Sequence, residues 1–92
     1  MLYNNTAAMA FNRGQYQQCL QACEWVLEVD THNVKALTRR AKAHHKLGQI
    51  PEAIATVIST LHLEPENAAL LALLTQWAPE TMKQQLRGEA EL

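Results

Sequence analysis

The stretch GQYQQCL at residues 14–20 is followed, 34 positions later, by GQIPEAI at residues 48–54. Sliding the whole sequence along itself by the same interval aligns further identical residues, among them Ala7 with Ala41. At several further positions the residue types match, as in the pairs Tyr3 with Leu37 and Cys23 with Val57. Self-similarity at a fixed period indicates a structural repeat.

Each repeat is predicted to form two helices. Asn33 and Asn67 stand directly before helical segments, where an asparagine side chain can accept a free backbone N–H. Gly14 and Gly48 stand where the first helix of each repeat should end, because glycine readily adopts the left-handed backbone that terminates a helix. Pro51 fits at the start of the next helix, where its missing N–H is not needed. No alternating run long enough for a strand occurs, so the sequence predicts an all-α fold.

A helix-turn-helix period of 34 residues is typical of the tetratricopeptide repeat (TPR) family. The chain resembles that family through a pattern of small and large residues, namely Tyr3, Ala7, Gly14, Tyr16, Cys19, Cys23, Val26 and Leu27 in one unit and Leu37, Ala41, Gly48, Ile50, Ala53, Val57, Leu61 and Pro65 in the next. The resemblance implies a short α-solenoid. We expect a single domain over residues 1–92, with a first repeat at 1–33 whose start is incomplete, a second at 34–67, and a covering helix or helices at 68–92.

The last segment departs from the repeat pattern. Leu71 aligns with Leu37, but no glycine follows at the expected place and Pro79 interrupts the segment. We therefore expect one helix over residues 68–78 and a further helix over residues 79–90. Their role would be to cover the apolar end of the stack, because each repeat alone leaves such a face open.

Length and composition exclude several classes of protein. Ninety-two residues, of which 48% are apolar, suffice for one small domain with a core. Eight Lys and Arg against nine Asp and Glu exclude a uniformly basic nucleic-acid binder. The longest apolar run, residues 68–74, is far shorter than the roughly 20 residues that span a bilayer. With no secretory signal visible, we expect a cytoplasmic protein without a membrane span.

The cations cluster in one part of the sequence. Five of the eight Lys and Arg residues fall between Lys35 and Lys46, and no acid lies among them. Lys35, Arg39, Lys42 and Lys46 are four, three and four residues apart, a spacing that puts them on one face of a helix. From the residues alone, this stripe is either an ordinary solvated face or a binding surface. In TPR stacks the first helices of successive repeats line a concave groove, which favours the binding surface.

A narrower resemblance gives this stripe a candidate role. Two segments resemble the last two repeats of the carboxylate-clamp TPR domain of large FKBP-type immunophilin co-chaperones: LYNNTAA (residues 2–8) and NVKALTRR (residues 33–40). In that family an Asn, a Lys and an Arg hold the acidic C-terminal tail, Glu-Glu-Val-Asp, of cytosolic heat-shock chaperones. The resemblance implies these roles for Asn5, Lys35 and Arg39, with Lys42 on the same face. The family's clamp also uses an earlier repeat, so the implied site is a partial clamp.

Other chemistry-bearing residues are interpreted as structural. Cys19 and Cys23 have a spacing that suits metal binding with a nearby His, but both occupy core positions, so we expect buried thiols and no metal. His44 is expected to be half-packed and His45 to face the groove. No catalytic triad, carboxylate pair or phosphate-binding loop is visible in the sequence. We therefore expect that the protein is not an enzyme and binds no cofactor. Few aromatic residues accompany the cations, which disfavours nucleic-acid binding.

Two interpretations of function therefore remain. In the first, the domain binds a protein or peptide with an acidic C-terminus. In the second, the domain is a structural module whose open N-terminal end pairs with another copy, as a homo-oligomer, or with the rest of a longer parent, without peptide binding. Trp25 is either a partner anchor or a residue packed beneath a further chain segment, whereas Trp77 is expected to be structural.

Overall fold

Helices account for nearly all of the chain that the computed structural model describes, which is residues 2–90 for the backbone and residues 5–79 for the side chains. There are five of them in these residues: α1 (Leu2–Asn12), α2 (Tyr16–Val29), α3 (Val34–Lys46), α4 (Ile50–Leu63) and α5 (Ala68–Ala90). The predicted all-α fold is confirmed. Residue 1 of the expected first repeat, residues 91 and 92 of the expected covering segment, and the side chain of Tyr3 lie outside the described parts.

Two glycines end the first helix of each repeat, as the sequence predicts. The φ angle is +76° at Gly14 and +78° at Gly48, in the left-handed region. The N–H of Gln15 then donates to the Ala10 carbonyl at 2.8 Å, and the corresponding bond in the second repeat measures 2.9 Å. This six-residue closure satisfies a carbonyl that the helix leaves free. Both repeats therefore make the same turn between their two helices.

Two asparagines begin the helices that follow each repeat boundary. The Asn33 side chain accepts the Ala36 N–H at 3.0 Å, and the Asn67 side chain accepts the Leu70 N–H at 3.1 Å. Each asparagine amide also donates to an acid three residues earlier, at 3.3 Å and 2.8 Å respectively. Both predicted caps are confirmed, and the boundary has the same construction at residues one repeat apart.

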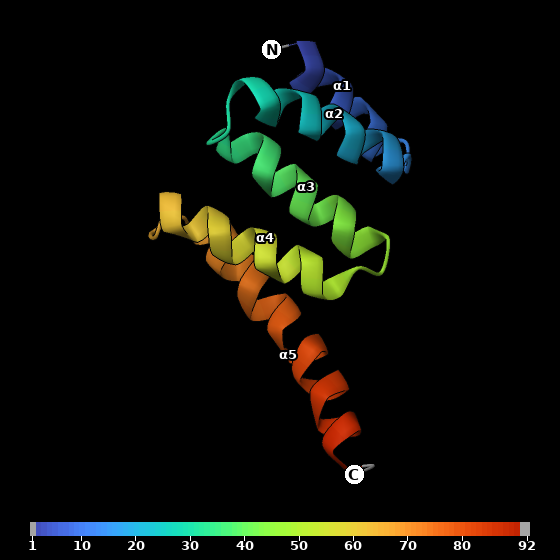
Figure 1. Ribbon diagram of the computed structural model, residues 1–92, viewed down its shortest axis with the longest axis vertical. Coiled ribbons are helices and arrows are strands. Elements are labelled where there is room, and N and C mark those ends of the chain that lie inside the picture. Colours follow the sequence, from blue (N-terminus) through green and yellow to red (C-terminus); the bar gives the residue numbers. More distant parts are fainter. Residues whose placement is uncertain (1, 91–92) are drawn as a thin grey trace.

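The helices pack in chain order into an elongated stack. Each helix contacts the next along the chain, and α1 also contacts α3, so the first helices of the two repeats are neighbours. The molecule measures 48 × 29 × 20 Å, with α1 and α2 at one end and α5 at the other (Figure 1). This arrangement is the α-solenoid that the repeat period predicts.

Small side chains dominate the interior. The first core contains Ala7, Ala10, Cys19, Ala22, Cys23 and Ala43, and the second contains Ala41, Ala53, Val57, Leu70 and Trp77. Because small residues at a contact let helices approach closely, these positions set the spacing of the stack. The one buried polar side chain described, Thr60, donates its hydroxyl to the Thr56 carbonyl at 2.7 Å and so leaves no unsatisfied group.

The C-terminal segment differs from the expectation of two helices. α5 is continuous from Ala68 to Ala90 and contains Pro79. A proline removes one helical hydrogen bond, to the carbonyl four residues earlier. That carbonyl belongs to Thr75, which is exposed, so water can take the place of the missing N–H. The expected covering role is confirmed, because Leu70 and Trp77 are buried in the second core.

The far half of α5 extends away from the other helices (Figure 1). Although α5 is the longest helix, neither it nor any other helix combines enough length with enough apolar character, among the described residues, to cross a bilayer.

Candidate peptide-binding groove

Three of the predicted site residues line one groove. It has a volume of about 410 Å³ and lies between α1 and α3. Its lining residues are Ala8, Phe11, Asn12, Val34, Lys35, Thr38, Arg39, Lys42 and Asn67. Lys35, Arg39 and Lys42 thus share a single hollow, as the four-and-three spacing on α3 requires.

Asn5 is exposed and is not among the lining residues. It precedes Ala8 by three residues and Asn12 by seven, which places it on the face of α1 that borders the groove. The structure therefore sets Asn5 beside the groove, one helical turn beyond the residues that line it. The sequence analysis did not predict Asn12 as a site residue. It could have done so, because Asn12 lies two helical turns after Asn5 on the same face of α1.

The groove is positively charged. Lys35 and Lys42 are exposed, Arg39 is half-buried, and no carboxylate of the described residues lines the hollow. Burial raises the pKa of Cys19, and the positive charge of Arg39 offsets a small part of this increase. Arg39 is thus more enclosed than the two lysines that line the same groove.

The two cysteines are structural. Cys19 and Cys23 are free and fully buried in the first core. Burial raises the pKa of both thiols, that of Cys23 to about 12, so neither is ionised near neutral pH. A protonated thiol is neither a nucleophile nor a metal ligand. Within the described residues, no group of three or more His, Cys, Asp or Glu residues could hold a metal ion.

A second, smaller hollow adjoins the groove. It has a volume of about 190 Å³ and is lined by Phe11, Lys42, His45, Lys46, Leu73, Gln76 and Trp77. The ring of His45 stacks on that of Trp77, with centroids 4.5 Å apart and planes 11° apart. His45 thus lines this second hollow rather than the groove that it was expected to face, and it stacks on Trp77, a contact that the sequence did not predict. Trp77, 3% exposed, is structural as predicted.

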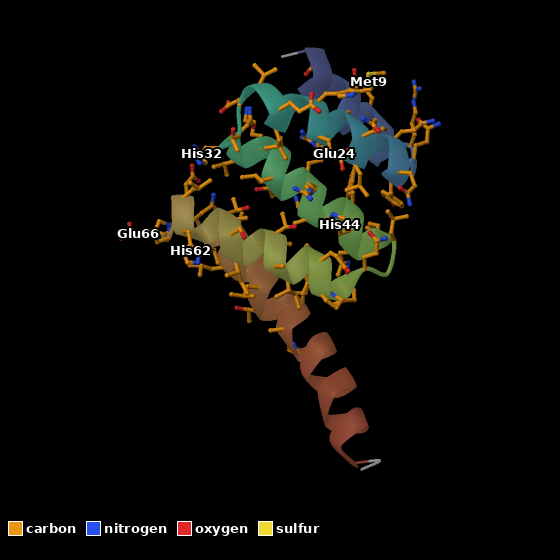
Figure 2. The ribbon with its side chains drawn as sticks, in the orientation of Figure 1. Met9, Glu24, His32, His44, His62 and Glu66 are labelled. Atoms are coloured by element: carbon orange, nitrogen blue, oxygen red, sulfur yellow. The ribbon has the colours of Figure 1, made fainter. Side chains whose placement is uncertain are left out.

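The neighbouring histidine has a different environment. His44 is half-buried, as expected, and its Nδ1 lies 2.7 Å from Oε1 of Gln49. This contact ties the end of α3 to the turn before α4. In Figure 2, His44 lies on α3, while His32 and Glu66 lie near the turns between successive repeats. His44 belongs to the turn rather than to either hollow.

Large apolar side chains are exposed at both ends of the stack. On α1 and α2 these are Met9 at 53%, Trp25 at 42% and Val29 at 89% exposure; Met9 lies at the N-terminal end in Figure 2. Between α4 and α5 a third hollow of about 370 Å³ has a mainly apolar lining: Ile58, Leu61, His62, Pro65, Leu71 and Leu74.

Comparison with known proteins identifies the repeat. The tetratricopeptide repeat family matches residues 10–76. The chain belongs to this family. The TPR chain is 30% identical over 91 residues to the Hsp70/Hsp90 co-chaperone CNS1 of Saccharomyces cerevisiae, which covers 98% of this chain and 23% of that protein. It is 38% identical over 69 residues to a human FK506-binding protein-like protein, covering 75% of this chain and 20% of the relative. The resemblance to FKBP-type TPR proteins is confirmed.

Solved structures give the same result. The TPR chain superposes on the Hsp90 co-chaperone Cns1 from Saccharomyces cerevisiae with a TM-score of 0.85 and 26% identity, over 98% of this chain and 29% of that one. It superposes on the UNC-45 chaperone, whose structure concerns binding and folding of muscle myosin, with a TM-score of 0.84 and 26% identity, over 97% of this chain and 10% of that one. The chain thus spans less than a third of each of these relatives.

Proposed function

We propose that this TPR domain is a peptide-docking module that binds the free, acidic C-terminus of a heat-shock chaperone, of the Glu-Glu-Val-Asp type, in a cytoplasmic co-chaperone role. The observation that carries the proposal is the placement of Lys35, Arg39 and Lys42 in one groove that no described carboxylate lines. The similarity to proteins named as Hsp90 co-chaperones also supports it. The proposal assigns binding and no catalysis.

Each polar residue has a distinct part in this proposal. The planar guanidinium of Arg39 gives two parallel hydrogen bonds to one carboxylate, whereas Lys35 supplies a point charge. Asn5, beside the groove, donates an uncharged N–H. Lys42, further along α3, pairs with an acidic side chain upstream of the terminus. A C-terminal Asp suits this set because it presents two carboxylates a short distance apart.

The test is a titration with a Glu-Glu-Val-Asp peptide and with the same peptide amidated at its C-terminus. We expect the free acid to bind and the amide to bind much more weakly, because amidation removes the carboxylate that the Lys and Arg side chains would pair with. Added salt should weaken binding of the free acid, since the groove is open to solvent. Equal binding of the two peptides, or no binding of either, would reject the proposal.

A matched pair of variants localises the site. Arg39→Ala should weaken binding of the free acid by about tenfold, the loss expected for a hydrogen bond to a charged group. Arg40→Ala removes the same charge from the next position on α3, which does not line the groove, and should leave binding nearly unchanged. Thermal unfolding of both variants checks that the domain stays folded. Equal weakening by the two substitutions would indicate a general charge effect.

A second candidate function is pairing through the ends of the stack. The exposed Met9, Trp25 and Val29 on the first two helices favour it, because exposed apolar patches mark interaction surfaces. In this alternative the chain associates with another copy or with the rest of a longer parent, and the basic stripe is ordinary surface. Light scattering at several protein concentrations tests self-association. A mass that rises toward that of a dimer would support pairing with another copy. A constant monomer mass would reject that pairing and leave only packing against the rest of a longer parent.

A further inference from the structure

The second hollow, here called the platform hollow, is continuous with the basic groove. The two share Phe11 and Lys42 as lining residues. The two hollows therefore adjoin along α3; residues of α1 line both, and residues of α5 line the platform hollow. A peptide whose C-terminus lies at Lys35 and Arg39 would therefore continue into the platform hollow.

The floor of the platform hollow is a pair of stacked rings. Trp77 is buried at 3% exposure and fixed in the second core, and His45 lies flat on it with an angle of 11° between the planes. Phe11 adds a third ring from α1. Flat aromatic surfaces bind other flat rings by offset stacking or by edge-to-face contact. The volume of about 190 Å³ leaves room for a single side chain and not for a helix.

The border of the platform hollow carries positive charge. Lys42 stands where it meets the basic groove, and Lys46 stands one turn further along α3. No carboxylate lines the hollow among the described residues. A ring that enters the hollow would thus lie near two cations of α3. This charge favours a ring that has acidic neighbours in its own peptide.

The length of α3 sets the spacing between the two subsites. A helix rises 1.5 Å per residue, so the six positions from Arg39 to His45 span about 9 Å. An extended peptide advances about 3.3 Å per residue, so about three peptide residues cover that distance. The side chain in the platform hollow would therefore lie about three residues before the one held at Arg39.

We propose that the platform hollow binds one aromatic side chain of an acidic peptide, about three residues upstream of the C-terminal residue, by stacking on His45. This inference rests on the proposed function and adds to it the composition of the ligand. It makes the domain selective for tails that combine a free C-terminal carboxylate, acidic residues and a ring.

The test compares three peptides in which Phe, Leu or Ala replaces the first Glu of Glu-Glu-Val-Asp, which is the residue three positions before the C-terminal Asp. We expect Phe to bind threefold to tenfold more tightly than Ala, as aromatic pairing provides beyond simple burial, with Leu between them. In His45→Ala the advantage of Phe over Leu should disappear, while binding of the tetrapeptide Glu-Glu-Val-Asp stays unchanged. His44→Ala removes the adjacent ring, which lines neither hollow, and should retain the advantage of Phe.

The outcomes separate the two proposals. If the tetrapeptide binds and the Phe, Leu and Ala peptides bind equally, the platform hollow is not a subsite, although the groove still is. If His45→Ala keeps the full advantage of Phe, the ring binds elsewhere and the inference is overturned. If the tetrapeptide does not bind at all, the proposed function fails, and the inference fails with it. Thermal unfolding of both histidine variants confirms that each is folded.

Discussion

At the scale of single residues, the two repeats solve the same packing problem with different atoms. Cys19 and Cys23 fill places that Ala53 and Val57 fill one repeat later, and all four side chains are fully buried. Sulfur packs there as a small apolar group. Unlike the methyl groups, however, a thiol can ionise. The stability of the first core therefore depends on pH.

The direction of that pH dependence follows from burial. Burial raises the pKa of Cys23 from 9.0 to about 12, so the folded state keeps a proton that the unfolded chain releases above pH 9. The stabilisation is complete below pH 9.0 and is lost as the pH rises toward 12. We expect the free energy of unfolding to fall by about 1 kcal/mol for each pH unit in that window. Urea unfolding below and above pH 9.0 measures it.

The second repeat supplies the control. A chain with Cys19→Ala and Cys23→Val carries the side chains of the second repeat at both positions, so it should lose less stability in the same window. An unchanged slope in this variant would mean that other groups cause the alkaline loss.

A second prediction concerns the backbone at Gly48. Its φ of +78° lies in the left-handed region, and a Cβ there would meet no atom within 4 Å, so a side chain costs only backbone strain. Gly48→Ala should lower the free energy of unfolding by about 1 kcal/mol. Gly48→Asn should cost less, because asparagine tolerates this conformation. Chemical denaturation compares the three proteins, and equal stability of the Ala and Asn variants would contradict this explanation.

At the scale of elements, α5 remains helical through a proline, a residue that usually interrupts a helix. Pro79 lies inside a continuous helix whose preceding residues are held by the burial of Leu70 and Trp77. Pro79→Ala would restore one helical hydrogen bond and remove the ring clash, effects worth up to about 3 kcal/mol locally. We expect stronger helical circular dichroism and slower amide exchange in α5. Unchanged or weaker helicity would show that the proline does not limit this helix.

The sequence predicts the elements that repeat, and it predicts a break in α5 that the structure does not have. Gly14 and Gly48, like Asn33 and Asn67, could be assigned because each has a counterpart 34 residues away that supports the same interpretation. No equivalent of Pro79 occurs in the other repeats, so the only guide at this position was the rule that proline interrupts a helix. That rule describes an isolated helix and does not include the packing that holds α5.

A similar difference explains which parts of the candidate site could be predicted from the sequence. Helical spacing on α3 sufficed to bring Lys35, Arg39 and Lys42 together, because these three residues share one element. The contact of His45 with Trp77 joins two elements, and Trp77 aligns with Ala43, a much smaller residue. The internal repeat therefore offered no template for this contact. Whether the residues in the groove bind a peptide remains a prediction.

At the scale of the whole molecule, the two cores make the stack a short linear array. In such arrays a change in one unit is felt mainly by its neighbours. Val57→Ala should cost about 2 kcal/mol and reduce amide protection in α4 and α5 more than in α1 and α2. Cys23→Ala, at the equivalent position of the first repeat, should give the opposite pattern. Hydrogen exchange distinguishes these two patterns of amide protection. A uniform loss of protection in all helices would indicate that the stack unfolds as a single cooperative unit.

One consequence follows from the location of the cations. Lys35, Arg39 and Lys42 all belong to α3. This helix begins at an asparagine cap that recurs before α5, and it ends at a glycine turn that recurs after α1. All three cations that are proposed to bind the anion thus lie on a single helix with defined ends. Grafting that helix into an unrelated repeat scaffold would transfer the cation set, and exchanging it for a neutral helix would erase that set while the architecture survives.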